Sequence, residues 1–191
     1  MKRLFLDTSN QYLYISIFDD NQELIKVIQE GNNNHSETLV DKLKETLDLI
    51  SLKPIDLDEI YVGRGPGSYT GVRVACTVAK VMAYTLNKPL YSFSSLDLIY
   101  TSNITSDVTK VVMDARRGFS YAKVLLLEDG KIKEILTESY IETNLLNEQY
   151  DVKMLNISNN DYQPLLILKY QLFKRIDDIH SFTPTYLRSG V

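Results

Sequence analysis

The sequence has few of the residues from which metal sites and nucleophile sites are built. It contains one cysteine, Cys76, and two histidines, His35 and His180, which lie far apart and have no neighbouring second ligand. A single cysteine excludes an internal disulfide and fits a reducing compartment such as the cytoplasm. Zinc-dependent hydrolysis needs more ligands than these, and no Ser/His/Asp arrangement stands out from the sequence. The sequence therefore argues against an independent catalytic centre.

The chain also lacks an excess of charge and a long apolar run. Its net charge is −4, and residues 1–95 and 96–191 have similar balances, with 10 and 11 basic against 12 and 13 acidic residues. Without a basic face, strong nucleic-acid binding by the chain alone is not expected. Asp7 interrupts the first apolar run, so we predict neither a signal peptide nor a membrane span. A length of 191 residues allows one large domain or two small lobes.

The most informative stretch is residues 60–86, where a short strand ends in a glycine-rich turn and a helix follows. The turn contains Gly63, Gly65 and Gly67. Ser68 and Thr70 are candidate N-caps of the helix, and a helix N-terminus after a glycine turn can bind an anion. The phosphate fingerprints do not fit, because Val72 stands where a Walker A loop has lysine and Thr70 where a dinucleotide loop has glycine. A structural strand-to-helix connection is favoured, and a phosphate cradle stays open as the alternative.

The helix after this turn is apolar on nearly every side. Between Val72 and Leu86, only Arg73 and Lys80 carry charge. An ordinary surface helix buries one stripe and exposes charged residues elsewhere, so we predict a second cover besides the sheet. In so short a chain a partner subunit is expected to supply that cover, with a central place in a large core as the alternative. The stripe expected to face the partner is Val72, Cys76, Ala79 and Met82. On this prediction, Ala79→Glu would break the pairing and leave the monomer folded.

The order of expected elements indicates an α/β protein with two lobes. Residues 3–30 are expected to form three strands, and Asp7 ends the first of them. An amphipathic helix at 35–50, a strand, the apolar helix and a strand at 90–93 follow. The second half repeats this opening more weakly, with a strand that ends at Asp114 and strands at 119–127 and 131–138. We therefore predict lobes at 1–93 and 94–191, the second of them shortened.

Several motifs resemble the TsaB (YeaZ) family. They are Gly-Arg-Gly-Pro-Gly-Ser-Tyr-Thr-Gly-Val-Arg at 63–73, His-Ser-Glu at 35–37, Asp-Ala-Arg at 114–116 and Pro-x-Tyr-Leu-Arg at 184–188. The resemblance covers most of the chain and is strongest over 1–95 and at the tail. It implies the actin-like ATPase (ASKHA) superfamily fold, with two lobes, mixed sheets flanked by helices, and a reduced second lobe.

The resemblance also implies a function. A TsaB-like chain would be a non-catalytic subunit that supports TsaD in forming N6-threonylcarbamoyladenosine at position 37 of tRNAs reading ANN codons. It would form a heterodimer with a TsaD homologue, which a homologue of the ATPase TsaE joins, and would meet tRNA only through the complex. In isolation a second copy of the chain could substitute for TsaD. No cofactor is expected on this chain alone, and ATP is expected at the level of the complex.

A stand-alone ATP-dependent kinase of the same fold, with Asp7 and Asp114 at the phosphates, is the alternative function. The resemblance gives no catalytic or metal-binding residue, since the His-x-x-x-His iron site of TsaD has no counterpart in this sequence. Partner binding is predicted for residues of the two helices, namely His35, Glu37, Leu39, Leu43, Tyr69, Val72, Arg73, Cys76, Ala79 and Met82. A nucleotide held at the subunit boundary would meet Asp7, Arg64 and Gly65.

Overall fold

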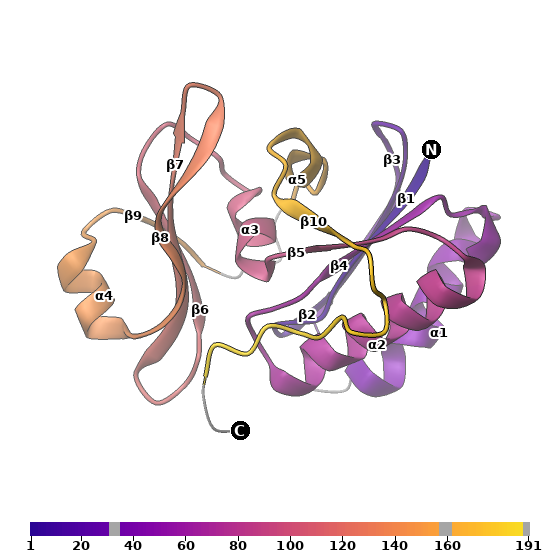
Figure 1. Ribbon diagram of the computed structural model, residues 1–191, viewed down its shortest axis with the longest axis horizontal. Coiled ribbons are helices and arrows are strands. Elements are labelled where there is room, and N and C mark those ends of the chain that lie inside the picture. Colours follow the sequence, from indigo (N-terminus) through magenta and orange to yellow (C-terminus); the bar gives the residue numbers. More distant parts are fainter. Residues whose placement is uncertain (31–34, 157–161, 189–191) are drawn as a thin grey trace.

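The computed structural model describes residues 1–30, 35–156 and 162–188, which form two β-sheets with helices around them (Figure 1). The first sheet has the order β10-β5-β4-β1-β2-β3 and the second the order β8-β7-β6-β9. The strands are β1 (Lys2–Asp7), β2 (Tyr12–Asp19), β3 (Gln22–Glu30), β4 (Glu59–Gly63), β5 (Leu90–Phe93), β6 (Thr109–Asp114), β7 (Phe119–Glu128), β8 (Lys131–Glu142), β9 (Lys153–Asn156) and β10 (Phe173–Ile176). The helices are α1 (His35–Leu49), the 3-10 helix η1 (Pro54–Asp56), α2 (Tyr69–Leu86), α3 (Ser95–Tyr100), α4 (Thr143–Gln149) and α5 (Leu165–Lys169). The strands of 3–30 and 110–138 lie in different sheets, which confirms the predicted two-lobed arrangement.

The first sheet is mixed and carries α1 and α2 side by side on one face (Figure 1). Its parallel strands β1, β4 and β5 are apolar and buried, as expected for strands covered on both faces. Leu4, Leu6 and Val62 pack there against Ala75 and Ala79 of α2. The two helices also pack against each other.

Local signals at the ends of α2 explain where it starts and stops. The Ser68 hydroxyl accepts a hydrogen bond from the Gly71 N–H at 3.3 Å, which confirms Ser68 as the N-cap, whereas Thr70 lies within the helix. The helix ends at Asn87, whose backbone is left-handed with φ 53°. The sequence thus sets both ends of the helix through side-chain capping and a residue that tolerates positive φ.

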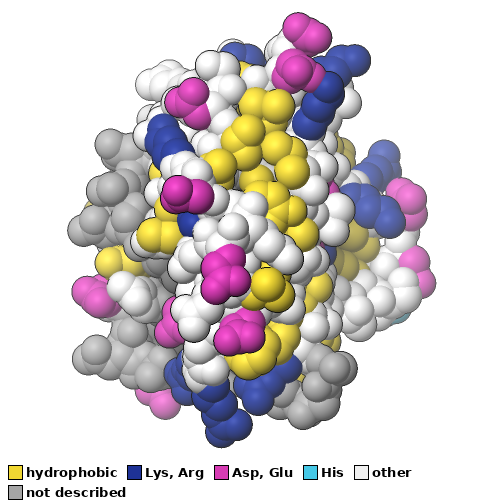
Figure 2. Space-filling model, turned by 90° about the vertical axis from the view of Figure 1, so that its left-hand side faces the viewer, with side chains coloured by type: hydrophobic (Ala, Val, Ile, Leu, Met, Phe, Trp, Pro, Cys, Tyr) yellow, Lys and Arg dark blue, Asp and Glu magenta, His cyan; other side chains and the backbone are white. Residues whose placement is uncertain are grey.

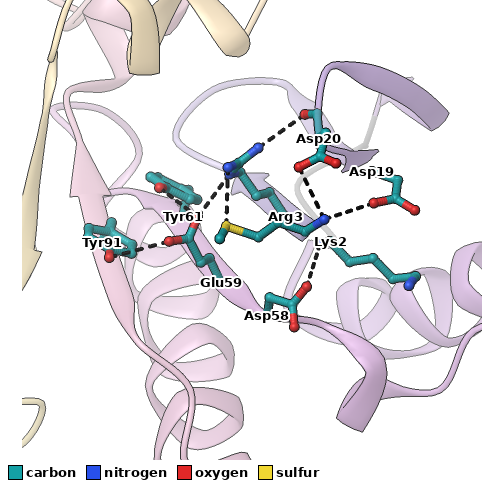
Figure 3. Close-up of polar contacts among 9 residues, drawn as sticks. Lys2, Arg3, Asp19, Asp20, Asp58, Glu59, Tyr61 and Tyr91 are labelled. Atoms are coloured by element: carbon teal, nitrogen blue, oxygen red, sulfur yellow. Dashed lines mark hydrogen bonds and ion pairs between the residues drawn. The ribbon is translucent and has the colours of Figure 1, made fainter.

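A second core fills the space between the two sheets and joins the lobes. Phe5 and Tyr61 stack at 4.7 Å between ring centroids, and this layer packs with Val111 and Leu125 of the second sheet. A polar cluster closes the layer at the start of β1, where the Glu59 carboxylate accepts hydrogen bonds from Arg3 Nε at 2.9 Å and the Tyr61 hydroxyl at 3.1 Å (Figure 3). The lobes therefore share one apolar interior.

The second lobe is thinner than the first. Its outer face packs on α4 through Leu146, which contacts Val112 and Ala122 in a small core. Figure 2 shows apolar side chains in a strip down this side of the molecule. The exposed large apolar residues of this lobe's elements are Ile135, Leu145 and Met154.

The C-terminal part departs from the predicted division at residue 93. β10 pairs antiparallel with β5, so the chain returns to the first sheet after β9, and the residues beyond it run along α2 (Figure 1). The segment 94–191, which we expected to form the second lobe alone, therefore contributes to both sheets. Helix α5 is short, because a left-handed turn at Gln171 (φ 56°) follows it and leads into β10.

Candidate functional site

The glycine turn before α2 packs tightly on the turn at the end of β1. The Ser68 N–H donates to the Ser9 carbonyl at 2.6 Å, and the Thr8 hydroxyl donates to the Gly71 carbonyl at 2.6 Å. A Cβ added at Gly71 would lie 1.9 Å from the Thr8 carbonyl oxygen, and one at Gly63 would lie 1.8 Å from Asp7 Oδ2. These glycines are needed for a close approach within the chain. The structural reading of the motif is supported over the phosphate cradle.

Gly71→Ala is expected to destabilise the fold by about 1–3 kcal/mol, because a side chain there overlaps a buried backbone carbonyl. Thermal unfolding followed by circular dichroism measures the effect. Thr77→Ala, at an exposed position of the same helix, is the matched control and should leave the midpoint unchanged or slightly raised. An unchanged midpoint for Gly71→Ala would show that the two turns do not depend on their close contact.

Asp7 is buried and its carboxylate is used within the chain. Oδ1 accepts hydrogen bonds from the Ser9 N–H at 2.7 Å and the Ser9 hydroxyl at 2.6 Å, and Oδ2 accepts one from the Ser95 hydroxyl at 2.6 Å. These contacts tie β1 to the start of α3. Asp114 is exposed at the end of β6, where Oδ1 accepts from the Arg116 N–H at 2.7 Å. The two aspartates occupy similar places in their sheets but serve different local contacts.

Arg64 and Gly65 connect three parts of the chain. Arg64 Nη2 pairs with Glu138 of β8 at 3.1 Å, while Nη1 donates to the hydroxyl of Thr185 in the C-terminal tail. The Gly65 carbonyl accepts from the Ser95 N–H at 2.9 Å, and its φ of 94° suits glycine. This turn therefore joins the first lobe, the second lobe and the tail.

A cleft of about 450 Å³ opens between the lobes beside Arg64. Its lining residues are Arg64, Ser92, Phe93, Ser94, Asp97, Lys123, Glu134, Thr137, Glu138, Gln171, Leu172, Phe173, Lys174 and Leu187. Of the three residues predicted to meet a nucleotide, only Arg64 lines this cleft, and Asp7 and Gly65 do not. This cleft therefore does not bring the three predicted nucleotide contacts together.

The cleft contains a buried ion pair that the sequence analysis missed. Lys123 Nζ lies 2.7 Å from Asp97 Oδ1 and 2.7 Å from Glu134 Oε1. Burial raises the pKa of Asp97 to about 6, although Lys123 acts in the opposite direction. Burial alone would lower the pKa of Lys123, but the two carboxylates outweigh it and the pKa is raised. At neutral pH the ammonium is therefore held charged, which makes it a structural cation and a poor nucleophile.

Most of the stripe of α2 that was predicted to bind a partner faces the first sheet and not the outside. Val72, Cys76 and Ala79 are buried against the first sheet, and Leu39 and Leu43 of α1 are buried in the same core. These five side chains are unavailable to another subunit, because the sheet of their own lobe already covers them. Burial also raises the pKa of the Cys76 thiol to about 12, which keeps it protonated.

Other predicted partner-binding residues do lie at the surface. Glu37, Tyr69 and Arg73 are exposed, and Met82 is partly buried. The side chain of His35, the first residue of α1, lies outside the described part of the chain. The outward side of the two helices thus retains some of the predicted contacts.

The second cover that the sequence predicted for α2 comes in part from the chain's own tail. Lys80 Nζ donates to the carbonyl oxygens of His180 at 3.1 Å and Phe182 at 2.9 Å. Phe182 is buried in the core beneath. Arg73 Nε donates to the Tyr186 hydroxyl at 2.9 Å. The tail therefore lies along one flank of α2, and α1 lies along another (Figure 1).

The remaining face of α2 is free of charge. Its residues are Thr70, Val74, Thr77, Val81 and Thr85, which recur every three or four positions and so share one side of the helix. Val81 is 55% exposed. The Thr85 hydroxyl donates to the Val81 carbonyl at 2.7 Å, which satisfies its polar atom within the helix. We call these five residues the outer stripe.

Comparison with known proteins decides the family. The model of the family described as "TsaD: tRNA N6-adenosine threonylcarbamoyltransferase" matches residues 27–174. The "tRNA threonylcarbamoyladenosine biosynthesis protein TsaB" of Bacillus subtilis is 31% identical over 142 residues, which are 74% of this chain and 62% of that protein. The chain belongs to this family, in its TsaB (YeaZ) branch. The predicted resemblance is confirmed.

Similar proteins match different shares of the chain. An uncharacterized protein of Mycoplasma genitalium is 26% identical over 196 residues, which are 99% of this chain and 96% of that one. The chain spans 62% of the length of Bacillus subtilis TsaB and 40% of the length of an uncharacterized Mycobacterium bovis relative.

Solved structures show the fold. YeaZ from Pseudomonas aeruginosa superposes with a TM-score of 0.65 at 24% identity, covering 74% of this chain and 66% of that chain. An uncharacterized protein with similarity to peptidase YeaZ from Pseudomonas aeruginosa gives 0.78 at 18% identity, covering 98% and 99%. The two mixed sheets with flanking helices therefore have the fold of these YeaZ structures.

The described residues offer neither a metal site nor a membrane-spanning helix. No group of three or more His, Cys, Asp or Glu side chains is placed to hold a metal ion in residues 1–30, 35–156 and 162–188. Within the same residues, no helix has the length and apolarity needed to cross a bilayer.

Proposed function

We propose that this chain is a non-catalytic subunit that supports a TsaD homologue in forming N6-threonylcarbamoyladenosine at position 37 of tRNAs reading ANN codons, in the cytoplasm. Membership of the TsaB branch supports this function. The polar side chains of the glycine turn and of the cleft also support it, because Asp7, Arg64 and Lys123 are engaged by other groups of the same chain. A subunit that supports a catalytic partner needs a stable fold and a binding face more than a free reactive group.

The outer stripe of α2 is the observation that carries this proposal. A surface helix of a monomer normally exposes charged residues, whereas these five threonine and valine positions expose none. Their β-branched side chains are short and hold few rotamers, so a helix of a partner can pack closely against them at small entropic cost. The occupant we assign is a helix pair of the TsaD homologue. Glu37, Tyr69 and Arg73 would lie at the rim of the contact.

Reconstitution with the TsaD homologue of the same cell tests the function. Modified tRNA is measured by mass spectrometry after supplying threonylcarbamoyl-AMP, with the chain alone, the homologue alone and both together. We expect product only where both are present, or a large gain over the homologue alone. Equal product with and without this chain would contradict a supporting role, and product from this chain alone would contradict a non-catalytic one.

A stand-alone kinase remains the alternative that a nucleotide titration separates from the proposal. A kinase must bind Mg-ATP by itself, so calorimetric titration of the isolated chain should give a measurable affinity under that alternative. The engagement of Asp7 by Ser9 and Ser95 disfavours it. We expect no binding to the isolated chain, and binding only after the TsaD and TsaE homologues are added.

A further inference from the structure

Three arginines have no partner among the residues that the structure describes. All seven arginines lie in the described residues, and four are engaged, namely Arg3 with Glu59, Arg64 with Glu138, Arg73 with Tyr186 and Arg175 with Asp177. The guanidinium groups of Arg116, Arg117 and Arg188 make no hydrogen bond or ion pair with any described residue. An arginine fork left unpaired in an acidic chain is available to an anion from outside.

Two of these arginines lie on the turn between β6 and β7. Arg116 and Arg117 have left-handed backbones, with φ 66° and 56°, which non-glycine residues adopt rarely. The turn is held by the Ala115 N–H, which donates to the Phe119 carbonyl at 2.9 Å, and by the Phe119 N–H, which donates to the Arg116 carbonyl at 3.1 Å. Both arginine side chains are exposed. Figure 2 shows Lys and Arg side chains gathered at the lower end of this lobe, where the turn lies in Figure 1.

Three aromatic rings adjoin the turn. Phe119 and Tyr121 share one face of β7, and Tyr140 of β8 lies opposite Tyr121. Phe119 and Tyr140 stack at 4.7 Å with an angle of 5°, and Tyr121 lies 5.8 Å from Tyr140. All three rings are partly exposed. Burial raises the pKa of Tyr121 while the charge of Arg188 opposes this, so the third unpaired arginine lies near the same rings.

From this arrangement we infer that Arg116, Arg117, Arg188, Phe119, Tyr121 and Tyr140, here called the arginine–aromatic surface, bind unpaired nucleotides of the tRNA in the complex with the TsaD homologue. The inference rests on the proposed function, which supplies the tRNA. Arginine forks bind phosphates, and exposed rings stack on bases without regard to sequence.

The local charge favours an RNA strand although the whole chain is acidic. Two carboxylates lie at this end of the sheet, Asp114 and Glu142, against three arginines. Asp114 is already engaged by the Arg116 N–H. Three arginines on and near the turn, together with three rings on the adjoining strands, offer groups for both the phosphates and the bases of a single strand. An acidic protein surface is the competing partner, and the test below includes it.

Fluorescence anisotropy tests RNA binding by this surface in the complex with the TsaD homologue. The two labelled probes are an RNA hairpin with an unpaired loop and a fully paired RNA of the same length. Arg116→Ala with Arg117→Ala should weaken hairpin binding about tenfold or more at low salt. The slope of log K against log salt should fall by about 1.4, since each single-strand phosphate contact contributes about 0.7. Tyr140→Leu should weaken binding by about fivefold or more at an unchanged slope. Arg175→Ala, an exposed arginine on β10, is the matched control and should bind as the wild type does.

Each other outcome has a defined meaning. Equal affinity and slope for all variants, or equal loss for Arg175→Ala, would overturn the inference. So would loss of the TsaD homologue from the arginine variants, because the surface would then be a protein contact. If the wild-type chain does not pair with the homologue, the proposed function fails separately. The RNA-binding inference is then tested by titrating the isolated chain with the same hairpin at low salt. An affinity of the double arginine variant equal to that of the wild type would overturn the inference, and a weaker affinity would support it.

Discussion

Ala79→Glu is expected to leave the chain largely unfolded. Ala79 is 0% exposed and packs between α2 and the first sheet, in a cluster with Leu6 and Val62. A carboxylate there would be both oversized and unpaired, and an uncompensated buried charge costs about 3–5 kcal/mol. That is a large share of the roughly 5–15 kcal/mol that keeps a domain folded. Circular dichroism and thermal unfolding of the purified variant measure the result.

Val81→Glu is the matched control for this variant, two residues further along the same helix. Val81 is 55% exposed, so its carboxylate would stay in water and the unfolding midpoint should remain close to that of the wild type. If Ala79→Glu melts like the wild type while Val81→Glu unfolds, the sheet-facing and outward sides of α2 have been exchanged. This pair of variants replaces the prediction made from the sequence, which placed Ala79 on the outside.

The second large effect is expected from Lys123→Met. Asp97 is buried and its carboxylate contacts Lys123 at 2.7 Å, so removing the ammonium leaves a buried charge without its partner. The expected loss is about 3–5 kcal/mol at neutral pH, measured by denaturant unfolding. Glu134, the other carboxylate at Lys123, is exposed and remains solvated.

The loss in Lys123→Met should depend on pH in a defined direction. The pKa of Asp97 is already raised to about 6 in the presence of Lys123, and removing the group that lowers it should raise it further. A carboxyl with a higher pKa in the folded chain than in the unfolded chain stabilises the fold below that pKa and loses this contribution as the pH rises through it. The deficit of the variant should therefore shrink on acidification from pH 7 to about pH 5.

The double variant Lys123→Met with Asp97→Leu controls for the ion pair itself. Replacing both partners by apolar groups of similar volume removes the unpaired charge, and stability should return to near the wild-type value with the pH dependence lost. A single variant that is as stable as the wild type, or whose deficit grows on acidification, would show that Asp97 is hydrated in the folded chain.

The strands and the glycine turn were predictable because their signals are local. Asp7 ends an apolar run of strand length, and Ser68 stands one residue before α2 as a cap. The same strand–Asp–turn pattern recurs at Asp114, and this repeat predicted two lobes. The structure has two sheets. Short-range patterns of this kind describe elements well because each depends on a few neighbouring residues.

The orientation of α2 was not predictable from periodicity. In a helix that is apolar on nearly every side, the spacing of apolar residues does not show which side faces the core. By this pattern Val72 and Ala79 are no better core candidates than Val74 and Val81. The rotation of α2 about its axis is set by two contacts. Small residues such as Ala79 pack on the sheet, and the C-terminal tail packs along one flank of the helix. The tail contact of Arg64 with Thr185 spans 121 positions of the chain, and no local pattern reports it.

One feature of the sequence does indicate the buried ion pair, although no motif contains it. Lys123 interrupts an apolar strand, and a charged residue in such a place implies a partner of opposite charge. The sequence does not say which acid that is, because Asp97 lies on α3, an element that packs across from β7 only in the folded chain. Long-range pairing of this kind requires the structure.

The central claim is that the outer stripe of α2 is the partner-binding face. The most direct test compares the affinity of the TsaD homologue for two variants, Val81→Glu and Ile135→Glu. Ile135 is an exposed apolar residue on β8 in the second lobe, so its replacement adds the same charge away from the helices. Isothermal titration calorimetry should show wild-type affinity for Ile135→Glu. For Val81→Glu it should show a loss of about 2 kcal/mol or more, a roughly 30-fold weaker complex, because the carboxylate becomes buried and unpaired in the interface. Equal affinity of both variants would contradict the account.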